Sequence, residues 1–194
     1  MDAFLTSTAI VALAEMGDKT QLLAILLASR FRKPLPISLG ILGATLANHF
    51  LAALAGQQIA SLLDSEAFRY AVAAGFIAMA IWTLIPDKMD DDGNKPARFG
   101  AFVTTLIAFF IVEMGDKTQV ATIALGAQFG SVVWVTTGTT LGMMIANVPA
   151  VLLGDTLVKR IPMRVMHLAA AALFLALGIW MIAELQGWLT VNPT

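Results

Sequence analysis

The sequence EMGDKTQ occurs twice, and each copy lies near the middle of a long apolar stretch. Carboxylates bind hard divalent cations, and each Asp or Lys at the centre of a membrane helix costs about 2.5 to 3.5 kcal/mol on insertion scales. Ionisable groups at such positions usually face a cavity, a partner or a transported ion. The two copies therefore indicate a metal site made of Glu15, Asp18, Glu113 and Asp116, with Lys19 and Lys117 beside them.

The charge of the two motifs fits a divalent cation. If each helix is continuous, its two acids and its lysine share about 100 degrees of arc, because successive helical residues turn by about 100 degrees. Four carboxylates and two lysines leave a formal charge of −2, which one divalent cation would neutralise. Oxygen ligands favour magnesium, calcium or manganese over copper or zinc. The lysines are expected to compensate carboxylate charge, and the alternative is a purely structural polar helix contact.

Gly17 and Gly115 stand inside the two motifs. Because glycine has no side chain, a neighbouring backbone can approach closely there. A glycine also allows the helix to open and to offer carbonyl oxygens to a cation. Either use is compatible with an ion site.

Further polar residues are candidates for additional ligands or for support of the ligands. Asn48 and Asn147 fall in corresponding spans, and their amide oxygens could bind a cation or form an interhelical hydrogen bond. His49 could relay protons or could be a hydrogen-bonded buried residue. The methionines of the motifs are expected to pack against neighbouring helices. Residues of lower rank follow the acids within the motifs: Thr20, Thr118, Gln21 and Gln119.

The elements that must position these residues are membrane helices. Of 194 residues, 58% are hydrophobic and 13% are charged, whereas about 25% charge is typical of soluble domains. Breaks that are charged or rich in Pro and Gly delimit six apolar stretches, each long enough to cross a bilayer. The sequence therefore predicts an all-α integral membrane protein with six transmembrane helices near residues 3–29, 36–60, 67–86, 99–127, 131–154 and 164–186.

A spacing of 98 residues relates the two halves of the chain. It separates the two motifs and also the pairs Gly56/Gly154 and Trp82/Trp180, whereas Asn48 and Asn147 differ by 99, which predicts one inserted residue. We therefore divide one membrane domain, 1–194, into repeat one (1–86), a cytoplasmic linker (87–98) and repeat two (99–194). Three helices per repeat is an odd number, so the second repeat must cross the membrane in the opposite sense, as in inverted-topology transporters.

Basic residues in the loops predict the orientation. Nine of the 12 Lys and Arg residues fall on one side of a six-span chain: Arg30, Arg32, Lys33, Lys88, Lys95, Arg98, Lys159, Arg160 and Arg164. The positive-inside rule makes that side cytoplasmic and places both termini on the other side. A net charge of −1 gives no basic face for nucleic acid, and the absence of cysteine excludes thiolate metal sites.

The twin motif, one copy per three-helix half, resembles that of the Gdt family of membrane cation/proton exchangers, which includes Golgi members and bacterial manganese exporters. The resemblance covers the whole chain. It implies manganese or calcium as the substrate, protons as the counter-ion, and Glu15, Asp18, Glu113 and Asp116 as the site. The short, cysteine-free chain is similar to the bacterial branch, which implies location in a bacterial inner membrane.

Together these observations predict a secondary transporter that exports a divalent cation, manganese before calcium, from the cytoplasm in exchange for protons. No enzymatic activity and no resident cofactor are expected, and the oligomeric state is left open. An exporter of small cationic amino acids is the alternative, because four acids could also bind such a substrate. An intramembrane hydrolase fits less well, since each motif Asp is followed by Lys and no H-E-x-x-H sequence is present.

Overall fold

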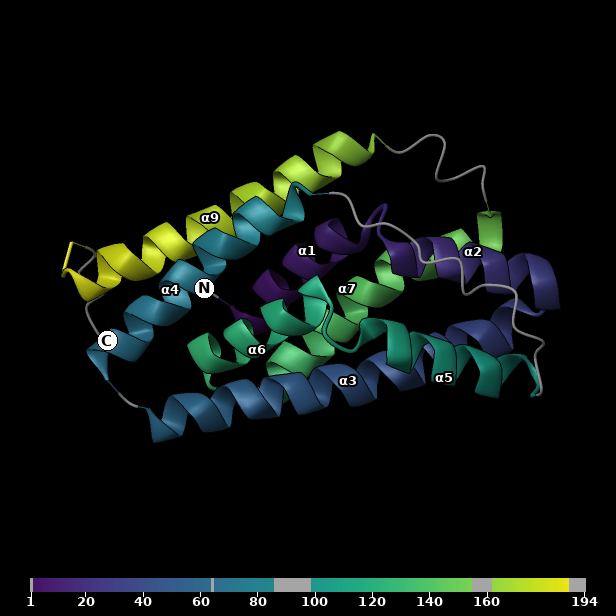
Figure 1. Cartoon of the computed structure of the whole chain (residues 1–194), viewed down its shortest axis with the longest axis horizontal. Helices are drawn as coiled ribbons and strands as arrows, with labels where there is room; N and C mark the ends of the chain where they lie inside the picture. The colour runs from purple at the N-terminus through teal and green to yellow at the C-terminus, as the bar shows by residue number, and fades with distance from the viewer. Residues whose placement is uncertain (1, 64, 86–98, 155–161, 189–194) are drawn as a thin grey trace.

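The computed structural model describes residues 2–63, 65–85, 99–154 and 162–188, and these ranges are helical throughout apart from short connections (Figure 1). The prediction of an all-α fold is confirmed for this part of the chain. The predicted cytoplasmic linker, 87–98, lies outside the described residues. The helices are α1 (Ala3–Glu15), α2 (Lys19–Phe31), α3 (Pro34–Leu62), α4 (Glu66–Thr83), α5 (Ala101–Glu113), α6 (Lys117–Phe129), α7 (Val132–Leu153) and α9 (Met163–Leu185).

Four of the six predicted spans coincide with single helices, namely α3, α4, α7 and α9. The stretches 3–29 and 99–127, which the sequence predicts as spans, are not single helices. Each of these stretches is interrupted within its motif, so that α1 ends at Glu15 and α2 begins at Lys19, while α5 ends at Glu113 and α6 begins at Lys117. The physical reason is the glycine of each motif, which adopts a positive φ that a right-handed helix cannot contain.

The helix boundaries repeat along the chain. Helices α1 and α5, α2 and α6, and the starts of α3 and α7 are each 98 residues apart, and the starts of α4 and α9 are 97 apart. In Figure 1, α1 and α2 follow one another along the long axis in one direction, whereas α5 and α6 run in the opposite direction. The two broken helix pairs therefore run in opposite directions in the structure.

The long helix of each half packs against the broken pair of the other half. Helix α7 contacts α1 and α2, helix α3 contacts α5 and α6, and α3 and α7 also contact each other. Glycine allows these close crossings: a Cβ atom on Gly40 would lie 2.8 Å from the Phe102 carbonyl oxygen in α5, and one on Gly138 would lie 2.6 Å from the Phe4 carbonyl oxygen in α1. Such small-residue crossings are typical of membrane helix packing.

Helices α4 and α9 form a second layer beside this core. They contact each other along their length, with Phe76 and Phe174 stacked at 6.3 Å between ring centroids. Helix α4 also contacts α6, and α9 also contacts α1, whereas α2 and α5 pack mainly on α7 and α3. The second layer therefore packs on α1 and α6, which come from different halves of the chain.

Three described helices are long and apolar enough to cross a membrane: α3, α7 and α9 from Arg164. Helices α1 and α5 are apolar but have only 13 residues each. Large apolar side chains cover the outer surface of α3, where Leu35, Leu39, Leu46 and Phe50 are exposed. An exposed apolar surface of this kind fits a chain whose solvent is lipid.

Candidate cation site between two broken helices

Each helix break is closed by the last residue of its own motif. Gly17 and Gly115 have φ values of 89° and 77°. The Gly17 N–H donates a hydrogen bond of 2.9 Å to Gln21 Oε1, and the Gly115 N–H donates one of 2.6 Å to Gln119 Oε1. Because an unpaired backbone N–H inside a membrane is costly, this contact stabilises the interruption. The side-chain oxygen of each motif glutamine therefore accepts a hydrogen bond from the backbone of its own helix break, and this bond stabilises the break.

The breaks change the geometry expected from a continuous helix. Glu15 and Glu113 are the last residues of α1 and α5, and Asp18 and Asp116 are the N-cap residues of α2 and α6, with extended φ and ψ. The prediction that the acids and the lysine of one motif share an arc of a single helix is thus wrong. Each break instead brings a helix C-terminus and a helix N-terminus to one place, an arrangement that transporters use to bind ions.

Three of the four predicted acids converge. One carboxylate oxygen from each of Glu15, Glu113 and Asp116 lies within 4.8 Å of the others, and all three side chains are buried. Asp18 is also buried but is not part of this group. Because Glu15 comes from the first half of the chain and the other two acids from the second half, the group forms only when both halves are packed together.

Threonine hydroxyls orient the converging carboxylates. Thr20 donates to Glu15 Oε2, and Thr118 donates to Glu113 Oε1 at 2.8 Å, with Asp116 Oδ2 at 3.2 Å. Both threonines are buried. These bonds leave Glu15 Oε1 and Glu113 Oε2 buried without a hydrogen-bond partner among the described residues. A bound cation would satisfy such oxygens, so the donor set fits a hard metal ion.

The two motif lysines have different contacts. Lys19 Nζ lies 2.6 Å from Asp116 Oδ1, so it pairs with an acid of the other half. Lys117 Nζ donates a hydrogen bond of 2.6 Å to the carbonyl oxygen of Ile85, just beyond the end of α4. A positive charge near a helix C-terminus is favourable because of the helix dipole. Lys19 thus places a positive charge beside the acidic group, whereas Lys117 connects the second helix break to the residues that follow α4.

His49 of α3 borders the group, and the asparagines of α3 and α7 make other contacts. His49 is fully buried, and its Nε2 lies 3.4 Å from Glu113 Oε1. Asn48 donates through Nδ2 to the Phe110 carbonyl oxygen at 3.0 Å. Asn147 donates through Nδ2 to the Met143 carbonyl oxygen at 3.1 Å, and its Oδ1 has no partner among the described residues. Asn48 therefore joins α3 to α5, whereas Asn147 keeps a buried oxygen that could bind an ion.

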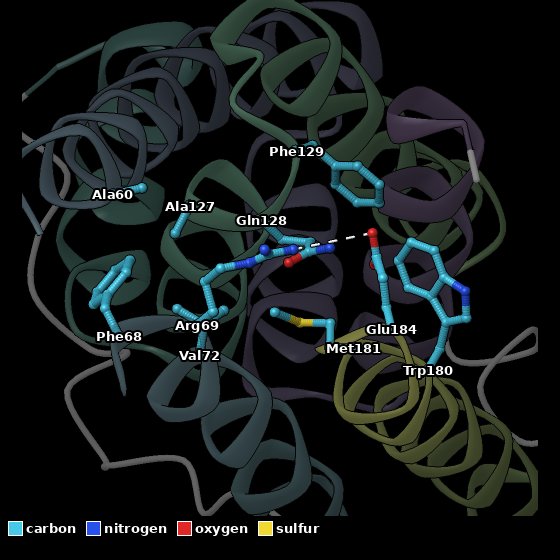
Figure 2. A pocket seen from close by; sticks show the side chains of 10 residues that line it. All are labelled: Ala60, Phe68, Arg69, Val72, Ala127, Gln128, Phe129, Trp180, Met181 and Glu184. Carbon is cyan, nitrogen blue, oxygen red and sulfur yellow. Dashed lines mark ion pairs between the residues drawn. The ribbon is translucent and has the colours of Figure 1, made fainter. Parts of the chain in front are cut away.

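The side chain of Met114 is exposed, and one surface pocket lies outside the group of converging acids. Met114 is 60% exposed at the end of α5. A separate pocket of about 380 Å³ lies between α3, α4, α6 and α9, where Arg69 and Glu184 approach to 4.0 Å (Figure 2). Its residues on α6 are Ala127, Gln128 and Phe129, at the opposite end of that helix from Asp116. The pocket contains none of the converging acids.

Known proteins share this sequence pattern. The profile of the family described as "Divalent cation/proton antiporter GDT1" matches residues 3–91 and 101–188, which include both motifs and both helix breaks. The chain belongs to the GDT1 family. The family resemblance drawn from the twin motif is thereby confirmed. GDT1 proteins are transporters and not enzymes. As antiporters, they exchange a divalent cation for protons.

Three relatives of this GDT1 chain cover most of its length. A Vibrio cholerae protein named "Putative manganese exporter" is 48% identical over 180 residues, which are 92% of this chain and 90% of the relative. A GDT1-like protein of Synechocystis sp. is 31% identical, covering 90% of this chain and 93% of the relative. GDT1-like protein 3 of Arabidopsis thaliana is 26% identical, and the match covers 92% of this chain and 69% of the relative. No solved structure matches the chain.

The sequence of this GDT1 chain predicted the acids and suggested that the motif threonines and glutamines contribute oxygens or support the ligands. The threonines do contact the carboxylates, whereas the glutamines close the helix breaks. The sequence also paired Asn48 with Asn147, yet Gly40 and Gly138, which are 98 residues apart, make matching contacts in the two halves. Because α3 and α7 each continue without a break beyond these glycines, the residue of the second half that corresponds to His49 is Asn147. The glycine between two acids in each motif was the available signal for a break.

We expect Gly115→Ala to destabilise the second break. The substituted Cβ would meet no atom within 4 Å, so the only penalty is the φ of 77°, which costs an L-residue about 1 to 2 kcal/mol. Gly100→Ala is the matched control, since its site is equally open and its φ is −64°. Thermal unfolding of both variants in detergent should show a lower Tm for Gly115→Ala alone. Equal Tm values would show that the positive φ is not required.

Proposed function

We propose that this chain exports Mn²⁺ from the cytoplasm in exchange for protons, and that the converging carboxylates of the two motifs are its binding site. The observation that carries the proposal is the buried group of Glu15, Glu113 and Asp116, whose oxygens lie within 4.8 Å of one another. Membership of a divalent cation/proton antiporter family supports the reaction type. The name of the Vibrio cholerae relative supports manganese over calcium and supports export over import.

The proposed membrane arrangement has six spans in two inverted repeats. The broken pairs α1–α2 and α5–α6 each cover 29 positions from first to last residue and act as one span each, and α3, α4, α7 and α9 supply the others. The opposite directions of the two broken pairs support this arrangement. The basic residues at the end of α2, Arg30, Arg32 and Lys33, then face the cytoplasm by the positive-inside rule. Both termini face the other side of what we propose is a bacterial inner membrane.

Exchange follows from competition for the same oxygens. A cation needs deprotonated carboxylates, so metal binding releases protons, and protons that arrive from the opposite side displace the metal. Because the two halves contribute different acids, rocking one half against the other can open the site to either side. Lys19, at 2.6 Å from Asp116, supplies a positive charge when neither occupant is bound.

Transport by purified protein in liposomes tests the site directly. With Mn²⁺ and acid on opposite sides of the membrane, we expect gradient-driven Mn²⁺ flux from the wild type. Glu113→Gln and Asp116→Asn should each lower it at least about tenfold, since each removes one of three converging carboxylates. Glu66→Gln is the control, because this acid is exposed at the start of α4.

The same assay separates the proposal from its alternative. Unchanged flux in both site variants would place the cation elsewhere. If the wild type moves neither Mn²⁺ nor Ca²⁺ but moves labelled lysine or arginine, the chain is an exporter of cationic amino acids. The ratio of Mn²⁺ flux to Ca²⁺ flux shows which metal is preferred.

Lys19→Ala should uncouple metal movement from proton movement. The ammonium group beside Asp116 holds the unoccupied acids together and prevents a leak of charge, so that its removal lets metal move without a matched movement of protons. We expect the ratio of Mn²⁺ flux with a pH gradient to flux without one to fall towards one. Lys19→Arg keeps the charge and should keep the ratio. Retention of coupling in Lys19→Ala would contradict this role.

A further inference from the structure

His49 is placed where a ligand of the transported ion would be. It lies in α3, is fully buried, and directs Nε2 to within 3.4 Å of Glu113 Oε1. Its other ring nitrogen, Nδ1, has no hydrogen-bond partner among the described residues. Neighbouring ligands of an octahedral ion, at about 2.1 Å from the metal, lie about 3 Å apart. A shift of a few tenths of an ångström would therefore bring Nε2 and Glu113 Oε1 onto one ion.

The internal repeat gives this position a counterpart. Gly40 in α3 meets Phe102 and Thr105 of α5, and Gly138 in α7 meets Phe4 and Ser7 of α1, so equivalent contacts are 98 residues apart. Both helices continue without interruption beyond these glycines, and the same spacing relates His49 to Asn147. Asn147 is also fully buried and retains an oxygen without a partner. The two halves thus present a nitrogen donor and an oxygen donor at equivalent places.

We propose that His49 Nε2 binds the transported cation beside Glu113 and that this nitrogen ligand makes the site prefer Mn²⁺ to Ca²⁺. The inference rests on the proposed function, because it assigns a further ligand to the same site. Ca²⁺ in proteins takes oxygen ligands only, whereas first-row transition metals accept imidazole nitrogen. A site made of carboxylates alone would not discriminate in this way.

The proposal also predicts the order of competing ions. The affinity of a site with nitrogen and oxygen ligands rises from Mn²⁺ through Fe²⁺ to Co²⁺. Co²⁺ should therefore inhibit Mn²⁺ flux at lower concentrations than Ca²⁺ or Mg²⁺ does. In His49→Asn, which gives both halves an amide at this position, the advantage of Co²⁺ over Ca²⁺ should shrink.

Pulsed electron paramagnetic resonance detects the proposed bond. Mn²⁺ is paramagnetic, and a directly bound imidazole modulates its spin echo at the frequencies of ¹⁴N. The tag-free protein, which has only His49 and His167 as histidines, should show this modulation when loaded with one equivalent of Mn²⁺. His49→Asn should lose it while still binding Mn²⁺, and His167→Asn should keep it. Bound Mn²⁺ without ¹⁴N modulation in the wild type would overturn the proposal.

Selectivity provides a second readout. We expect His49→Asn to lower the ratio of Mn²⁺ affinity to Ca²⁺ affinity about tenfold, mainly by weakening Mn²⁺. A variant with an unchanged ratio would show that His49 does not select the metal. Because the spectrum of the wild type alone tests the bond, an unstable variant leaves the test intact. Absence of Mn²⁺ binding and transport in the wild type would instead refute the proposed function, and the inference with it.

Discussion

Three carboxylates crowded into the interior of a membrane protein are the constraint on which the rest of this structure depends. Two unit charges 4.8 Å apart, the upper limit for these oxygens, repel by about 3 kcal/mol at an effective dielectric constant of about 20. The repulsion must be compensated, and the chain does so with Thr20, Thr118 and Lys19. In the proposed function, the remaining negative charge gives the site its affinity for a divalent cation or for protons. The repulsion between the carboxylates is thus relieved either by a bound divalent cation or by bound protons in this proposal.

The backbone serves this site through its internal repeat. Both halves break a helix at the same motif position, close the break with a glutamine and pack their long helix against the broken pair of the other half. This crossed packing means that the acids of one half are supported by helices of the other. In the proposed mechanism, relative movement of the halves alters the distances between the acids, because both halves contribute acids to the group.

The two halves of the chain differ in the contacts that equivalent side chains make. Lys19 pairs with an acid of the second half, whereas Lys117 donates to a carbonyl oxygen just beyond the end of α4, and the 98-residue spacing relates His49 to Asn147. The sequence was sufficient to predict the helical class and the family, because composition and exact motif duplication carry those signals. Apolar periodicity did not locate the helix breaks, since it is the same on either side of the glycine, although the glycine between two acids indicated that the helix could open there. The sequence also could not assign the partners of the lysines, because these lie in helices distant in sequence.

Proton release on metal binding tests the central claim, that one buried site holds either a cation or protons. Mn²⁺ can be titrated into the purified protein in weakly buffered detergent solution while a pH indicator and calorimetry report proton release and binding. The account predicts saturable binding of one Mn²⁺ per chain, release of protons in proportion to binding, and weaker binding as the pH falls. Saturable binding with no proton release, and with an affinity independent of pH, would contradict it.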